Sequence, residues 1–147
     1  MPTARGSCGV AISSGLIYIL GGTNGNEALT ANEIYTPSRD NGSDNPWQVG
    51  PALPEGRYAM GVASVSDLIY IIGGKGKVSQ ELSLLELSPT VTTWQTLSAS
   101  IPATWSFLGT VPLGKYLYVI GGLIEDNPTG LNLSYQAIYT VVIPFVR

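Results

Sequence analysis

Histidine is absent from the 147-residue chain, and Cys8 is its only cysteine. Zinc sites are built largely from these two residue types, and Ser-His or Cys-His catalysis needs an imidazole as its base. A single cysteine also excludes a disulfide within the chain and is typical of a reducing compartment. The sequence therefore predicts no metal site, no cofactor and a cytoplasmic location.

Charge is also scarce, because charged residues make up only 12% of the chain, with 7 basic and 10 acidic side chains. A nucleic-acid binder needs clustered cations to neutralise phosphates, and seven scattered ones do not supply such a cluster. Long apolar runs are missing as well, since a run such as 16–20 is far too short to span a bilayer. We therefore expect neither nucleic acid nor membrane as a partner.

Hydrophobic residues, glycine and proline are plentiful, and they are arranged in repeats. A Gly-Gly doublet ends an apolar stretch three times, at 21–22, 73–74 and 121–122. A recurrence of about 50 residues indicates a repeat architecture. Arg5, Arg57 and Trp105 each stand at the same distance before a doublet, so the repeats are expected to span 1–52, 53–100 and 101–147.

Each repeat predicts a small antiparallel sheet, mostly of four strands. The strand that precedes each doublet is apolar on both faces, so we expect both faces to be covered. A fourth strand is marked by Trp47 and Trp94 in the first two repeats, and the third repeat ends in 141–147 without a tryptophan. The expected strands are 7–12, 16–20 and 33–37, then 59–64, 68–72 and 85–89, then 106–111, 116–120 and 137–140.

These residues resemble the kelch repeat, whose marks are a glycine doublet after an apolar strand, a downstream tyrosine and a later tryptophan. In the second repeat Leu87 replaces the tyrosine, and in the third Trp105 replaces the arginine. The resemblance implies an all-β fold in which each repeat is one blade of a β-propeller. The motif residues are Gly21, Gly22, Tyr35, Trp47, Gly73, Gly74, Trp94, Gly121, Gly122 and Tyr139.

Three blades are too few to close a propeller, which usually has four to eight. Two apolar blade faces would stay open, and large apolar patches are rarely left exposed. We therefore expect a homodimer in which two half-propellers form a six-bladed ring with twofold symmetry. The alternative is that the chain is a fragment of a longer propeller whose other blades belong to the same polypeptide.

One mouth of the channel is the expected ligand site, because hairpin topology brings the residues before each first strand close to the loops after the doublets. In peptide-binding relatives, arginines at this repeat position grip acidic groups, which suits the forked guanidinium. The alternative is that these arginines bridge blades through backbone carbonyls, and that the aromatic residues only pack. The candidate ligand-binding residues are Arg5, Arg57, Tyr58, Trp105, Asn24 and Lys75.

The favoured function is a non-catalytic interaction scaffold that holds a peptide, a protein or a small anionic ligand at this mouth. A small-molecule or sugar-modifying enzyme in the same pore is the first alternative, although no carboxylate pair can be placed across the pore from the sequence. A half-propeller with a purely architectural role is the second. We therefore expect no catalytic residues.

Overall fold

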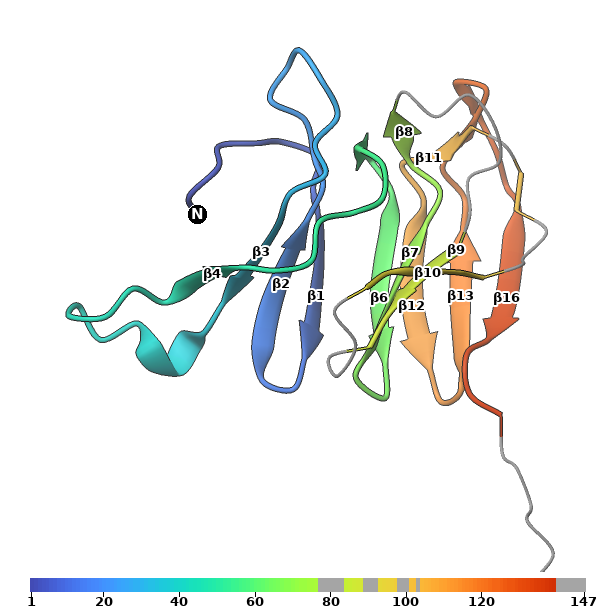
Figure 1. Ribbon diagram of the computed structural model, residues 1–147. Helices are drawn as coiled ribbons and strands as arrows, with labels where there is room; N and C mark the ends of the chain where they lie inside the picture. Colours follow the sequence, from blue (N-terminus) through green and yellow to red (C-terminus); the bar gives the residue numbers. More distant parts are fainter. Residues whose placement is uncertain (77–83, 89–92, 98–100, 103, 140–147) are drawn as a thin grey trace, which may run out of the picture.

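The computed structural model describes residues 1–76, 84–88, 93–97, 101–102 and 104–139. Apart from one short 3-10 helix, η1 (Pro37–Arg39), its regular elements are β-strands, so the all-β prediction is confirmed. Three antiparallel sheets stand side by side in chain order, as Figure 1 shows. No helix in the described part of the chain is long and apolar enough to cross a membrane.

The three sheets repeat one topology. In the first sheet the strand order is β1-β2-β3-β4, and in the second it is β6-β7-β9-β10. The third sheet has the order β12-β13-β16 within the described residues, and the end of the third repeat, 141–147, for which the sequence left a fourth strand open, lies outside them. The bounds are β1 (Gly9–Ser13), β2 (Leu16–Leu20), β3 (Asn32–Tyr35), β4 (Trp47–Val49), β6 (Gly61–Val65), β7 (Leu68–Ile72), β9 (Leu84–Leu87), β10 (Gln95–Leu97), β12 (Gly109–Leu113), β13 (Tyr116–Ile120) and β16 (Asn132–Gln136).

The strands that precede the doublets, β2, β7 and β13, have the bounds expected from their apolar runs. The first strand of each sheet starts two or three residues later than expected. The cause is a positive φ at Ser7, Ala59 and Phe107, with values of 51°, 53° and 53°, because this conformation interrupts an extended strand. The same backbone kink therefore occurs at the equivalent position of each sheet.

The third strand of the third sheet differs from the expectation of 137–140. It is β16, in which Tyr135 pairs with Leu117 just as Tyr35 pairs with Ile17 in the first sheet. Tyr135 thus holds the register position that the sequence pattern assigns to Tyr139, and Tyr139 lies beyond the strand with 67% of its surface exposed. The hydrogen-bond ladder to β13 sets the register here, and a local match of sequence letters does not.

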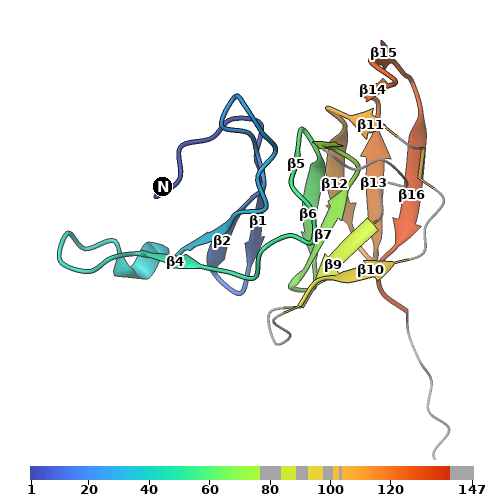
Figure 2. The same ribbon diagram turned by 45° about the horizontal axis from the view of Figure 1, so that its top comes forward.

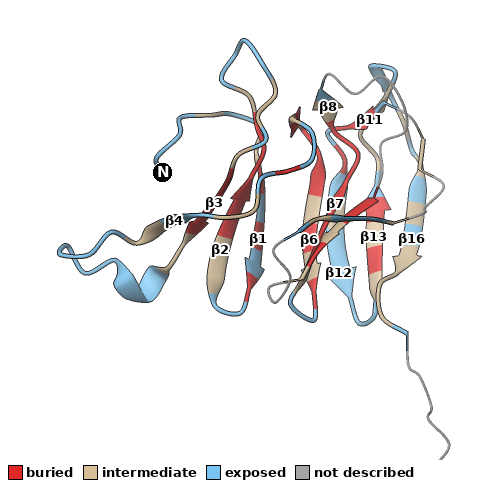
Figure 3. Cartoon of the chain, in the orientation of Figure 1, coloured by how far each residue is buried: buried red, intermediate tan, exposed pale blue. Residues whose placement is uncertain are grey.

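The hydrophobic core lies in two layers, one on each side of the middle sheet. Ile69 and Ile71 pack toward the first sheet, and Tyr70 and Ile72 pack toward the third. Ile69, Tyr70 and Ile71 have no exposed surface, which agrees with the expectation that both faces of this strand are covered. Figure 3 shows the contrast with β12, which is mostly exposed.

The first strands of the three sheets lie in a row, with β6 between β1 and β12, and we call them the inner strands. Backbone hydrogen bonds link the segments that precede them. The Ala59 amide donates to the Ser7 carbonyl at 2.9 Å, and the Phe107 amide donates to the Ala59 carbonyl at 2.7 Å. The three residues with positive φ thus form a continuous chain of contacts from sheet to sheet.

Candidate functional site: the rim beside the glycine doublets

Short pairings at one end of the three sheets bring the predicted site residues together. β5 (Arg57–Tyr58) pairs with β8 (Lys75–Gly76), and β11 (Trp105–Ser106) pairs with β14 (Leu123–Ile124), which continues to β15 (Asn127–Pro128). In the first sheet the same position is an isolated bridge between Gly6 and Thr23. We call this end the rim; it is uppermost in Figures 1 and 2.

Arg57 and Trp105 are buried at the rim and bind the carbonyl groups of their own doublets. Arg57 is 1% exposed, and its Nη1 donates to the Gly73 oxygen at 3.4 Å. Trp105 is fully buried, and its Nε1 donates to the Gly121 oxygen at 2.7 Å. Burial lowers the pKa of Arg57, and nearby Glu55 opposes this shift. Both side chains are therefore buried against a carbonyl of their own repeat, and the role of Arg57 as a bridge between blades stays a prediction.

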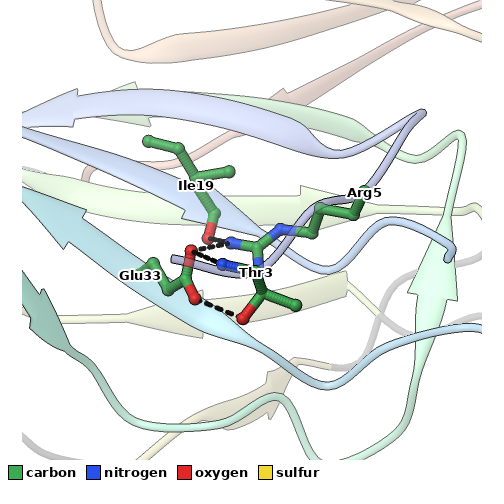
Figure 4. A network of polar contacts seen from close by, with 4 residues as sticks. All are labelled: Thr3, Arg5, Ile19 and Glu33. Atoms are coloured by element: carbon green, nitrogen blue, oxygen red, sulfur yellow. Dashed lines mark hydrogen bonds and ion pairs between the residues drawn. The ribbon is translucent and has the colours of Figure 1, made fainter. Parts of the chain in front are cut away.

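Arg5 is also enclosed, but its partner is an acidic side chain (Figure 4). Its Nη2 lies 3.2 Å from Oε2 of Glu33 and donates to the Ile19 carbonyl at 3.1 Å, and its side chain has no exposed surface. The Thr3 hydroxyl donates to Oε1 of Glu33 at 2.5 Å. Because Glu33 itself is 5% exposed, the arginine supplies the countercharge for a buried carboxylate.

Glu33 was not among the residues singled out from the sequence. It pairs with Ile19, and the equivalent pairs in the other sheets are Leu85 with Ile71 and Leu133 with Val119. The first sheet therefore carries a carboxylate where the other two carry leucine. The alignment of Tyr35 with Leu87 already places Leu85 at the position of Glu33, and only the assignment of Leu133 required the strand register.

The exposed part of the rim combines an ion pair with aromatic side chains. The Nζ atom of Lys75 pairs with the Asp126 carboxylate, which raises the pKa of the lysine, and lies 5.8 Å from the centre of the Phe107 ring. Phe107 is 55% exposed, and Tyr58 is half-buried next to Lys75 in the β5–β8 pair. Sequence reasoning selected Tyr58 and Lys75 as candidates; it placed the segment of Asp126 at the mouth without selecting this residue, and it did not select Phe107.

Asn24 lies on the exposed loop after the first doublet. Its Oδ1 accepts hydrogen bonds from the backbone amides of Asn26 and Glu27, each at 3.0 Å. Its described contacts are therefore those of a side chain that shapes its own loop.

Acidic side chains elsewhere serve as structural acceptors. Oδ1 of Asp67 in the second sheet accepts the Ser14 amide of the first sheet at 2.7 Å, and the Asp67 carbonyl accepts the Ser13 hydroxyl at 2.8 Å. The Asp40 carboxylate accepts a hydrogen bond from the Tyr35 hydroxyl. These contacts hold sheets and loops together.

Comparison with known proteins adds the family. The model of the kelch motif matches residues 4–41, which include β1, β2 and β3. Kelch repeat and BTB domain-containing protein 1 of ectromelia virus is 30% identical over 92% of this chain, and Kelch-like protein terF of Aspergillus terreus is 31% identical over 92%. Kelch-like protein 26 of the mouse is 28% identical over 78%.

The chain spans only part of these relatives: 24% of the viral protein, 33% of the fungal protein and 19% of the mouse protein. The shared region covers most of this chain in each case. With three sheets of one topology, each carrying a doublet at the end of its second strand, the chain belongs to the kelch-repeat family.

Proposed function

We propose that the chain is a non-catalytic kelch scaffold that binds a protein or peptide at the rim. The observation that carries this proposal is the cluster of Tyr58, Lys75, Phe107 and Asp126, assembled from the second and third sheets, in which Tyr58 and Lys75 are half-buried and Phe107 and Asp126 are exposed. Aromatic side chains are enriched at protein interfaces because they bury a large area at a low entropic cost. The partner expected here has an apolar side chain for Phe107 and a carboxylate for Lys75.

Selection from a phage-displayed peptide library tests the rim. Peptides that bind the unaltered chain are then measured against Phe107→Ala and Lys75→Ala, and Gln48→Ala on the exposed outer strand β4 is the matched control. We expect the two rim variants to lose about tenfold or more in affinity, as truncated interface anchors commonly do, and the control to lose none. Peptides that bind both rim variants with the affinity of the unaltered chain would refute the site.

We further propose that two copies close into a six-bladed ring. The exposed large apolar side chains within the sheets all belong to the two end sheets. Six is the only multiple of three within the usual range of propeller blades, so two copies are the smallest closed assembly. The exposed residues of the first sheet are Val10, Ile12 and Val49, and those of the third are Val111, Leu113 and Ile120.

Light scattering tests the ring directly. The expected molar mass is twice the 15.5 kDa of one chain. A well-folded particle with the mass of a single chain would contradict the ring, because its end faces would then be stable in water.

The small share of each relative that the chain spans favours a second candidate assembly, in which further blades of the same polypeptide cover the end faces. Intact-mass measurement of the protein purified from its natural source separates the two. A mass well above that of one chain supports the longer propeller.

A further inference from the structure

The glycines of the first sheet form holes that the second sheet fills. A Cβ atom added to Gly9 would lie 2.1 Å from Cγ2 of Val62, and one added to Gly21 would lie 2.3 Å from the Arg57 carbonyl oxygen. Both distances are far below van der Waals contact, so only glycine allows the second sheet to approach this closely. The Gly22 amide then donates to the same Arg57 oxygen at 2.9 Å.

The junction between the second and third sheets repeats this arrangement. A Cβ atom on Gly61 would lie 2.0 Å from Oγ1 of Thr110, and one on Gly73 would lie 2.3 Å from the Trp105 carbonyl oxygen. The Gly74 amide donates to that oxygen at 2.8 Å. The junction is therefore a repeated device, in which a side chain at the second position of the next inner strand covers a glycine.

The third sheet has glycines at the same two repeat positions, Gly109 and Gly121, and no described side chain of another sheet covers them. A Cβ atom on Gly109 would meet only the Ile120 carbonyl oxygen, at 3.5 Å, and one on Gly121 only the Thr129 carbonyl oxygen, at 3.7 Å. Gly109 is exposed, whereas its counterparts Gly9 and Gly61 are buried.

The matching side chain is on the opposite end of the same chain. Val10 pairs with Ile19, in the register in which Val62 pairs with Ile71 and Thr110 with Val119. It is the same residue type as Val62, it points away from the second sheet, and it is 54% exposed.

From these observations, and resting on the ring proposed above, we propose the register in which two copies join. Val10 of a second copy covers Gly109, and the Arg5 carbonyl of that copy approaches Gly121 and accepts a hydrogen bond from the Gly122 amide. Twofold symmetry makes two identical junctions of this kind. Val111 and Leu113 follow Gly109 at alternate positions of β12, and so lie on the same face of the sheet, and they are 50% and 69% exposed; the junction therefore also covers apolar surface.

Gly109→Val is the decisive substitution. In a single chain the Cβ of the new side chain makes only an ordinary van der Waals contact, with the Ile120 carbonyl oxygen at 3.5 Å, and the backbone of Gly109 is not in the left-handed region, so folding is expected to survive. In the proposed junction it collides with Val10 of the second copy. We expect sedimentation velocity to show a dimer for the unaltered chain and for the control Gln48→Val, and a monomer for Gly109→Val.

Cys8 provides a second readout that reports on the junction itself. It stands at the repeat position of Met60 and Leu108, which contact the glycine holes in the two existing junctions, and it is half-buried in the single chain. The junction is expected to shield it, so alkylation by iodoacetamide should be about tenfold or more faster in Gly109→Val, since thiol reactivity follows access.

The outcomes separate this inference from the ring. If the unaltered chain is a monomer, both are overturned. If it is a dimer that Gly109→Val leaves intact, with unchanged alkylation of Cys8, the register is overturned and a dimer of another geometry stands. Should Gly109→Val fail to fold, Val10→Asp replaces it, because this exposed side chain tolerates charge in the single chain but not in a dry junction.

Discussion

The indole nitrogen of Trp105 lies 2.7 Å from the carbonyl oxygen of Gly121, in the place where Arg57 reaches Gly73 in the sheet before it. Two chemically different side chains thus perform one task, which is to donate a hydrogen bond to the carbonyl of the first glycine of a doublet. The shared requirement is a long side chain that ends in an N–H donor.

Trp105→Phe should destabilise the chain by about 1–3 kcal/mol, because it leaves the carbonyl of the half-buried Gly121 without its donor. Urea denaturation monitored by circular dichroism measures the loss. Trp47→Phe is the control for ring size. Trp47 lies on the outer strand β4, where its half-buried ring packs against Tyr35 of β3. Equal losses in the two variants would show that ring size, and not the hydrogen bond, is what matters at Trp105.

Arg5→Met should cost about 3–5 kcal/mol, because it strands the buried carboxylate of Glu33 without a countercharge. The double variant with Glu33→Leu should recover most of this loss, because Leu85 and Leu133 fill the equivalent positions of the other sheets. Thermal and urea unfolding of the two single variants and the double variant give the coupling. Additive losses would mean that the pair contributes no interaction of its own.

Asp67→Ala should lower stability by about 1 kcal/mol, because it removes the carboxylate that accepts the Ser14 amide across the first junction. Asp67→Asn should lose less, since an amide oxygen can accept the same bond. Asp44→Ala, in an exposed loop of the first sheet, is the control. Urea midpoints for the three variants provide the comparison, and an asparagine variant as weak as the alanine one would argue against the bond.

Ionisation of the Tyr70 hydroxyl should contribute to the loss of stability at alkaline pH. Burial, then a hydrogen bond with Glu86, raises the pKa of this hydroxyl well above its ordinary value of 10.0. The folded state thus favours the neutral phenol, so this stability is complete below pH 10 and falls as the pH rises toward the folded-state pKa. Tyr70→Phe should show a shallower decline in thermal midpoint above pH 10.

The stability of Tyr70→Phe at neutral pH is the reference for this pH series. At neutral pH Tyr70→Phe should be slightly less stable than the unaltered chain, because the hydroxyl donates to the Ala137 carbonyl at 3.3 Å. Parallel curves for the two proteins across the alkaline range would assign the decline to other tyrosines, such as Tyr18, whose pKa burial also raises.

The strands that precede the doublets could be predicted from the sequence to the residue. Each is a five-residue apolar run that ends at a glycine with positive φ, as at Gly21 and Gly73, so local chemistry defines both the strand and its end. The third strand of the third sheet could not be placed in this way. Its position depends on pairing with β13, which is a long-range contact that letters around Tyr139 do not encode.

The candidate site also has one part that could be predicted from the sequence and one that could not. The sequence placed Tyr58 and Lys75 at the rim, because hairpin topology alone brings their segments together. The contacts of Lys75 with Asp126 and Phe107 are set only in the folded chain, since Lys75 and Asp126 lie 51 residues apart and meet across a junction between sheets.

The sequence by itself determined that the chain consists of kelch repeats, because the glycine doublets, apolar strands and turns are local features that recur in one register. Only the tertiary structure decided which side chains are buried and which face solvent. It enclosed Arg5 and Arg57, exposed Phe107, and left Gly109 open on one end of the chain and Val10 on the other. Burial is set by neighbours that are distant in sequence, and packing between whole sheets supplies them.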